Sequence, residues 1–239
     1  MKKHLLLLIV LCATGCASVA TSHRPNADYY NSATYPRAES TDDEPLFGST
    51  EGLLSDEDIE RILNYRLKLP DTNRIAILKL SSDSYWRNYS NDFAQLNQSI
   101  VTDFVDRLRA SPRVYDASFL PSMLVPEKRT APYLREAAAR YQADLLLAYR
   151  SKCRTFEKYK FLDPNETKAY CSIEAVLLDV RSGIVAFTVI STNEFSSKKE
   201  QGDTNFQETK KRAEMAALGL SLAEVASELR SFLTDIDTL

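Results

Sequence analysis

Glycine and histidine are scarce in this sequence, and their scarcity removes several classes of enzyme. None of the six glycines lies in the nucleotide-binding patterns G-x-x-x-x-G-K-[ST] and G-x-G-x-x-G, or in the G-x-S-x-G pattern of serine hydrolases. Of the two histidines, His4 falls in the opening sixteen residues and His23 in the polar segment that follows. Histidine-based triads and acid–base pairs are therefore excluded from the rest of the chain, and no metal site or cofactor is expected there.

The opening apolar segment is too short to cross a membrane. Residues 5–11 (LLLLIVL) fall far short of the roughly 20 apolar residues that a bilayer needs. They follow Lys2 and Lys3 and lead into small residues, a pattern typical of a cleavable secretion signal. Removing the two lysines with the signal takes the formal net charge from −3 to −5, so bulk attraction to nucleic acid is not expected.

The signal ends in residues 13–16 (ATGC), which resemble the lipobox of bacterial lipoproteins, although Ala13 stands where that family prefers leucine. The resemblance implies cleavage before Cys16 and several acyl chains on that residue, which give stable anchoring where one chain is marginal. Ala17 is not aspartate, which by the same resemblance favours the outer membrane, with the domain facing the periplasm. The alternatives are an inner-membrane or cell-surface location, or a plain signal peptide with an incidental cysteine.

Three segments follow from this pattern: a signal peptide (1–15), an acylated cysteine with a flexible tether (16–52) and a single α/β domain (53–239). The tether is rich in Ser, Thr, Asn, Asp, Tyr and Pro and has too few aliphatic residues to fold. It would span roughly 30 to 35 Å as a flexible chain. Tyr29, Tyr30 and Tyr35 are either a motif for a partner or incidental aromatics.

Hydrophobic periodicity predicts the elements of the domain. Ser55 caps a first helix with an apolar face of Ile59, Ile62, Leu63 and Leu67. Strands are expected over residues 74–80, 114–120, 145–160, 168–180 and 184–195, and helices over 96–108, 132–141 and 206–234. The last helix has a buried seam of Met215, Leu218, Leu222, Val225, Leu229 and Phe232, and Gly219 inside it indicates close packing. The order predicts an α/β (α+β) fold, a mixed sheet of about five strands with helices packed on it.

Two cysteines, Cys153 and Cys171, remain after Cys12 leaves with the signal and Cys16 is acylated. The expected compartment is oxidising and permits them to pair. Placing them opposite each other in the predicted hairpin matches apolar with apolar and cation with anion, and a slip of one residue would lose this match. The pairs are Leu147 with Leu177, Tyr149 with Ala175, and Arg150 with Glu174. This register favours a cross-strand disulfide, and two buried free thiols are the alternative.

Four segments together resemble the α/β domain of a group of bacterial envelope lipoproteins: RIAILKL, LRASPRVYD, YLREAAARYQADLLLAYR and LLDVRSGIVAFTV, between residues 70 and 235. The group includes the TolB amino-terminal domain, the curli secretion lipoprotein, the activators of penicillin-binding proteins and the rhombotarget lipoproteins. Its motifs A-x-x-x-x-A-D and D-x-x-[ST]-G match residues 138–144 and 179–183 and are architectural. The TolB propeller and the long curli pore hairpin are missing.

Two sets of residues are candidate partner surfaces. The first is a basic strand face of Arg150, Lys152, Arg154, Lys158 and Lys160, which suits an acidic partner, an anionic glycan or a lipid headgroup. The second is the aromatic loop of Tyr85, Trp86 and Tyr89. A solvated strand face, and a Trp86 that caps the core, are the alternatives.

The sequence therefore predicts a non-enzymatic, membrane-anchored envelope lipoprotein that binds a protein partner in envelope assembly, secretion or cell-wall synthesis. The alternative is an oligomeric ring subunit of an outer-membrane secretion apparatus, where copies pack against each other. A hydrolase that uses carboxylates alone is a third hypothesis. Clusters such as Asp56-Glu57-Asp58 and Asp42-Asp43-Glu44 suit helix capping and solvation better than catalysis.

Overall fold

The computed structural model describes residues 45–47, 54–80, 91–159, 161 and 163–236. The chain divides into residues 1–39 and 40–239, and all described residues belong to the second unit. The lipobox with Cys16, the aromatic loop of Tyr85, Trp86 and Tyr89, and Lys160 lie outside the described residues. Their proposed roles therefore stay predictions.

The described elements follow the predicted order. The helices are α3 (Asp56–Asn64), α4 (Asn91–Arg109), α5 (Ala131–Arg140) and α6 (Phe206–Asp235), with a short 3-10 helix, η3 (Ser122–Leu124). The strands are β1 (Asn73–Lys79), β2 (Val114–Phe119), β3 (Leu145–Lys158), β4 (Glu166–Asp179) and β5 (Val185–Lys198). None of the helices in these described ranges is long and apolar enough to span a membrane.

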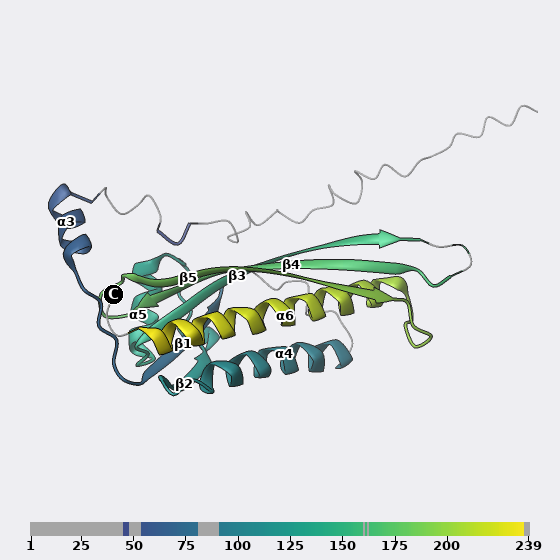
Figure 1. Cartoon of the computed structure of the whole chain (residues 1–239), viewed down its shortest axis with the longest axis horizontal. Helices are drawn as coiled ribbons and strands as arrows, with labels where there is room; N and C mark the ends of the chain where they lie inside the picture. Colours follow the sequence, from purple (N-terminus) through teal and green to yellow (C-terminus); the bar gives the residue numbers. More distant parts are fainter. Residues whose placement is uncertain (1–44, 48–53, 81–90, 160, 162, 237–239) are drawn as a thin grey trace, which may run out of the picture. The chain divides into compact units, whose positions relative to one another are not determined.

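The five strands form one mixed sheet in the order β2-β1-β3-β4-β5 (Figure 1). β1 pairs in parallel with β2 and with β3, while β3, β4 and β5 are antiparallel. This confirms the predicted fold class. The parallel part of the sheet comes from the alternating β and α segments, and the antiparallel part from the meander.

The sheet is covered differently on its two faces. α6 and α4 cover one face, where a large core holds Leu147 and Ile173 with Leu222 of α6 and Phe104 of α4. α5 covers part of the other face through a smaller cluster that contains Leu146. Successive side chains of a strand point to opposite faces, so odd-numbered residues of β3 and β4 face α6 and even-numbered residues face away from it.

α6 begins at the Asn205 cap, whose side-chain oxygen accepts from the backbone N–H of Gln207 (2.8 Å) and of Glu208 (3.2 Å). Its predicted seam is confirmed. Five of the six residues are buried, and Phe232 is partly buried and stacks on Phe187. The inference from Gly219 needs correction, because a Cβ there would lie 3.5 Å from Ile100 of α4, which is ordinary contact.

The predicted register of the β3–β4 hairpin is confirmed. Cys153 pairs with Cys171, and the flanking pairs are those expected from the sequence. The two cysteines form a disulfide, and their Cα atoms lie 4.1 Å apart. The carbonyl of Tyr149 accepts from the N–H of Leu80, which follows β1. The N–H and C=O groups of odd-numbered β3 residues therefore point toward β1 and away from β4. Cys153 and Cys171 therefore form a non-hydrogen-bonded pair, where side chains lie closest.

Beyond Tyr149, β3 no longer pairs with β1. From there β3 (residues 150–158), β4 (166–174) and β5 (190–198) continue as a three-stranded antiparallel extension, which we call the arm (Figure 1). α6 reaches the arm, because Lys210 near its start forms an ion pair with Glu157.

The two motifs that carried the family resemblance have architectural roles. The Asp144 carboxylate accepts from the backbone N–H of Arg74 (2.9 Å) and from the Arg181 guanidinium (2.6 Å), joining the starts of β1 and β3 to the β4–β5 turn. Asp179 accepts from the backbone N–H of Ser182 (2.7 Å) and from its hydroxyl (2.6 Å), which shapes that turn.

Gly183 completes the turn with a φ of 79°, a conformation that favours glycine. The Arg135 guanidinium lies against it and donates to the carbonyls of Val180 (3.1 Å) and Arg181 (2.7 Å). A Cβ at this position would lie 2.6 Å from that guanidinium. The backbone angle therefore favours glycine, and a Cβ would also require the end of the Arg135 side chain to shift.

Candidate functional site

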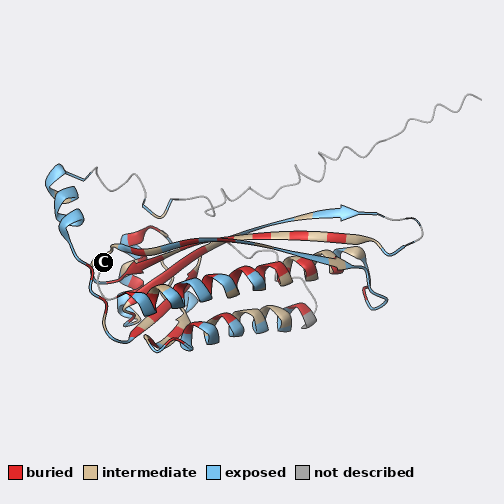
Figure 2. Cartoon of the chain, in the orientation of Figure 1, coloured by how far each residue is buried: buried red, intermediate tan, exposed pale blue. Residues whose placement is uncertain are grey.

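The arm has one covered face and one open face. Ala169, Cys171 and Ile173 are buried on the side of α6. The opposite side, which we call the open face, consists of the even-numbered arm residues: Arg150, Lys152, Arg154, Phe156, Lys158, Glu166, Lys168, Tyr170, Ser172, Glu174, Ile190, Thr192, Glu194, Ser196 and Lys198. The α5 cluster contains none of these residues. Figure 2 shows the far part of β3 as exposed.

The open face is positively charged, although the whole chain carries a net charge of −3. Its strands present six cations and three carboxylates. Two cross-strand ion pairs order it: Lys168 with Glu194 (2.8 Å) and Lys198 with Glu166 (3.3 Å). The hydrogen bond between Lys168 and Glu194 raises the pKa of the lysine and lowers the pKa of the glutamate, so both stay charged at neutral pH.

Aromatic side chains lie among these charges. The rings of Phe156 and Tyr170 meet edge to face with centroids 5.7 Å apart, and the Lys168 ammonium lies 5.3 Å from the Tyr170 centroid. Phe156 is 61% exposed and Ile190 is 73% exposed. The two residues lie at opposite ends of the arm, so each is a single exposed apolar side chain among charged groups.

A hollow of about 400 Å³ lies at the end of the arm, lined by residues 156–158, 166–168 and 196–198. Its side chains on the open face combine Phe156 with three lysines, Lys158, Lys168 and Lys198, and with Glu166. The hollow can accept an apolar side chain that is flanked by acidic groups, because its lining offers one ring and an excess of positive charge.

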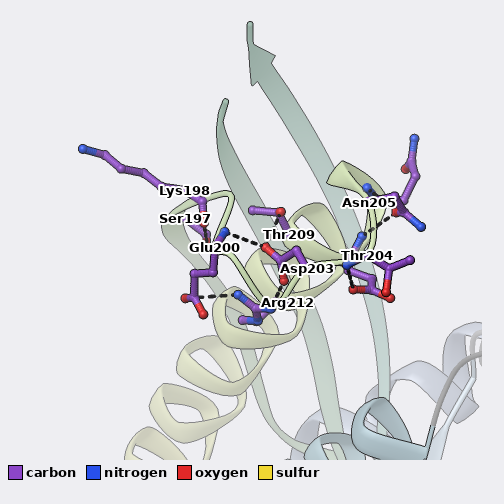
Figure 3. Close-up of polar contacts among 10 residues, drawn as sticks. Ser197, Lys198, Glu200, Asp203, Thr204, Asn205, Thr209 and Arg212 are labelled. Atoms are coloured by element: carbon purple, nitrogen blue, oxygen red, sulfur yellow. Dashed lines mark hydrogen bonds and ion pairs between the residues drawn. The ribbon is translucent and has the colours of Figure 1, made fainter. Parts of the chain in front are cut away.

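The loop between β5 and α6 fixes the end of the arm (Figure 3). The buried Asp203 carboxylate accepts from the backbone N–H of Glu200 (2.9 Å), the Thr209 hydroxyl (2.8 Å) and the Arg212 guanidinium. Burial raises the pKa of Asp203, but these three hydrogen bonds outweigh it and hold the pKa below its ordinary value. Figure 3 shows the Lys198 side chain extending away from this cluster.

α6 binds the β4–β5 ladder from the covered face, because the Ser221 hydroxyl donates to the carbonyl of Cys171 (2.8 Å). The backbone N–H of Asn193 donates to the Ser221 hydroxyl (3.1 Å). The Glu224 carboxylate accepts from Ser191 (2.6 Å) and from the Asn193 side chain (2.6 Å), and these bonds lower the pKa of Glu224. These bonds fix β4 and β5 of the arm against α6 on the side opposite the open face.

The structure brings together four of the five residues of the predicted basic strand face. Arg150, Lys152, Arg154 and Lys158 share the open face, as alternation along one strand requires. Sequence reasoning missed the other residues there, chiefly Phe156, Tyr170, Lys168 and Lys198. Alternation along β3 and the cysteine register already placed the first three on this face.

The described residues do not gather three or more histidine, cysteine, aspartate or glutamate side chains in a group that would hold a metal ion. The described carboxylates with lowered pKa values are engaged structurally. Asp203 holds a loop, Glu224 binds the side chains of Ser191 and Asn193, and Asp116 binds Arg74 (3.0 Å) and Arg109 (2.9 Å).

Comparison with known proteins gives structural matches only. No protein-family model and no curated protein matches the chain. Three solved structures illustrate the matches. A hypothetical protein of Chlamydia trachomatis, CT253, is 11% identical, with a TM-score of 0.38, over 68% of this chain and 98% of that one. The PelC dodecamer of Paraburkholderia phytofirmans is 17% identical, with a TM-score of 0.35, over 70% and 95%. Lipoprotein GNA1162 of Neisseria meningitidis is 13% identical, with a TM-score of 0.27, over 66% and 98%. These values establish neither a family nor a partner for this chain.

Proposed function

We propose that this protein is a membrane-anchored lipoprotein of the bacterial envelope that binds a protein partner through the open face of the arm and catalyses no reaction. The observation that carries the proposal is the open face itself. Its residues are exposed or half-buried, and it bears six cations against three carboxylates in a chain of opposite net charge. Its exposed Phe156 beside charged groups suits a protein surface with acidic and apolar groups.

The anchor is proposed from the sequence, with acyl chains on Cys16 in the outer membrane. Leu46 packs against the α5 cluster, and its carbonyl accepts from the backbone N–H of Ala131 (2.7 Å). The domain is thus attached to the preceding chain on the face of the sheet that also bears the open face. Thirty residues separate Cys16 from Leu46, and a flexible chain of that length spans about 30 Å. The arm would therefore work close to the membrane, in reach of envelope assembly, secretion or wall-synthesis complexes.

Photo-crosslinking in intact cells tests the partner. A photoreactive residue at Thr192, an exposed position on the open face, should give a discrete adduct with a protein. The same residue at Ser227, exposed on α6, is the matched control and should not give that adduct. The variant Arg154→Glu/Lys158→Glu should lose the adduct at unchanged protein level. Failure to form any adduct at Thr192 would refute the proposal.

The anchor has its own test. Cells fed labelled palmitate should label the wild-type protein but not a Cys16→Ser variant, and the variant should leave the membrane fraction. Labelling that persists in the variant would place the acyl chains elsewhere and refute the assignment of Cys16.

A ring subunit of an outer-membrane secretion apparatus is the second candidate function. The specific observation that favours it is an exposed apolar helix, α3, in a chain that also exposes the open face. A protein that stays monomeric at high concentration in detergent would argue against this candidate.

A further inference from the structure

The helix α3 has an apolar side that the described residues do not cover. Its nine residues include none that is buried, and Ile59, Ile62 and Leu63 are between 43% and 70% exposed. The Ser55 hydroxyl accepts from the backbone N–H of Asp58 (3.1 Å), as the predicted capping requires. A helix this short is marginal in water unless packing stabilises it. Its apolar side therefore calls for a contact from elsewhere.

The charge of α3 is opposite to the charge of the open face. Its first turn contains Asp56, Glu57 and Asp58, Glu60 follows, and Arg61 is the one cation of the helix. The hollow at the end of the arm presents the complementary groups, three lysines beside the Phe156 ring. An acidic helix with exposed isoleucine and leucine thus matches both the charge and the apolar content of the hollow.

The size of α3 also fits the open face of the arm. A helix of nine residues is about 14 Å long, and helices are about 10 Å wide with their side chains. The arm is three strands wide, with strands about 4.8 Å apart, and its nine-residue strands extend about 30 Å. One copy of α3 can therefore lie on the open face without contacting the rest of the sheet.

The α3 of the same chain is held at a distance from the hollow. The Arg113 guanidinium pairs with Asp71 (3.8 Å) and donates to the carbonyl of Ile236 (3.5 Å), which places Asp71 at the end of α6. The start of α6 lies at the arm, because Lys210 pairs with Glu157. The 26 positions from Lys210 to Ile236 correspond to about 39 Å of helix.

The segment that joins α3 to the sheet does not bridge this length. The seven residues from Asn64 to Asp71 extend at most about 25 Å, and Leu67 and Leu69 among them are buried in the core. The C-terminal end of α3 therefore stays short of the hollow in its own chain. A neighbouring copy has no such restriction.

We infer that α3 of one copy docks on the open face of the arm of a second copy. Ile62 and Leu63 cover Phe156 and enter the hollow, and Asp56 and Glu60, which flank the apolar side one turn apart, face Arg154 and Lys158. The inference rests on the proposed function, since it uses the same face, and it names a second copy as the partner. The contact joins two different surfaces, so it propagates from copy to copy and closes into a ring or extends as a filament. Anchoring of all copies to one membrane raises their effective concentration.

Charge reversal on both sides tests the contact. Full-length protein in lipid nanodiscs is mixed as two isotope-labelled populations, and association is followed by crosslinks between light and heavy chains. Asp56→Lys/Glu60→Lys and Arg154→Glu/Lys158→Glu should each weaken association about tenfold, because each introduces like charges across the contact. A mixture of the two variants should recover association to within about threefold of wild type. The matched control is Arg107→Glu/Arg140→Glu, which reverses two exposed arginines on α4 and α5 and should change nothing.

A photoreactive residue at Leu63 maps the docking site. The expected product joins α3 of a light chain to the peptide that contains Phe156 in a heavy chain. Crosslinks confined to one chain, or failure of the mixed charge variants to recover, would overturn the inference. The Thr192 adduct separates the two proposals. An adduct that contains only a different protein supports the proposed function and overturns this inference, an adduct with a second copy supports both, and the absence of any adduct overturns both.

Discussion

Opening the disulfide between Cys153 and Cys171 should destabilise the protein by about 3 kcal/mol. The bond closes a loop with a sequence separation of 18, and the chain-entropy relation for a loop of that size gives about this free energy at 25 °C. This free energy is that of the cross-link alone, because reduction removes no heavy atoms from the core. Cys171 is fully buried against α6 and its thiol still fills the same space, while Cys153 is exposed.

The assay is urea unfolding of the acylated protein with and without reductant. A domain of this size loses roughly 2 to 3 kcal/mol of stability per molar urea, so reduction should lower the midpoint by about 1 to 1.5 M. Non-reducing electrophoresis should show a mobility shift on reduction. A Cys153→Ser variant, which has no disulfide to lose, should show neither change and should unfold near the midpoint of the reduced wild type.

Two results would contradict this reasoning. Equal midpoints with and without reductant would mean that the loop is already constrained in the unfolded chain. A reduced protein that loses its arm in a separate early transition would mean that the bond stabilises the arm and not the domain. The second result would appear as two transitions or as a smaller slope with urea.

Three further predictions concern single residues. Gly183→Ala should cost about 1 to 2 kcal/mol in urea unfolding because of its positive φ, whereas Gly202→Ala, which has open space at that site, should be close to neutral. Gly219→Ala should stabilise the protein by up to about 1 kcal/mol, since the α6 helix gains propensity and the new methyl group meets Ile100 at an ordinary distance; a loss of stability would show that α4 and α6 pack more closely. Asp203→Asn should cost about 2 kcal/mol at pH 7. Because the folded-state pKa of Asp203 lies below its ordinary value of 3.8, the stability it supplies is fully present above that pH and is lost as the pH falls through the folded-state pKa. Unfolding curves at pH 7 and pH 3 should therefore differ less for the variant than for the wild type.

The parts of the fold that the sequence predicts best are those where two independent signals agree. The β3–β4 register was predictable because the cysteine pair and the charge pair of Arg150 with Glu174 require the same alignment. The α6 seam was predictable because its apolar residues repeat at helical spacing over many turns. Local chemistry alone specifies both features.

The sequence contains no comparable residue pair that fixes the register of β5 against β4. A register shift between Leu177 and Leu178 changes which β5 residues lie opposite β4, and periodicity in a sequence does not reveal a shift of this kind. The hollow depends on that alignment, because Lys198 reaches it only through the pairing of β5 with β4. The part of the candidate site that β5 contributes therefore needed the structure.

The helix α3 shows the opposite situation. Its capping and amphipathic pattern predict a helix correctly, but they do not say what its apolar side contacts. In the structure Leu67, the last residue of the predicted apolar face, lies beyond the helix and is buried, while Ile59, Ile62 and Leu63 are exposed. An amphipathic pattern predicts that one side of a helix is in contact with other apolar groups, but it does not identify those groups.

The arm is stabilised from the side opposite the open face. A three-stranded extension needs support on one hydrophobic face, and α6 supplies it through Ala169, Cys171 and Ile173. The disulfide ties β3 to β4, and Ser221 of α6 binds the backbone of both β4 and β5. The open face adds two cross-strand ion pairs, Lys168 with Glu194 and Lys198 with Glu166. The excess of positive charge on this face and its exposed Phe156 are the features on which the proposed contact with a partner depends.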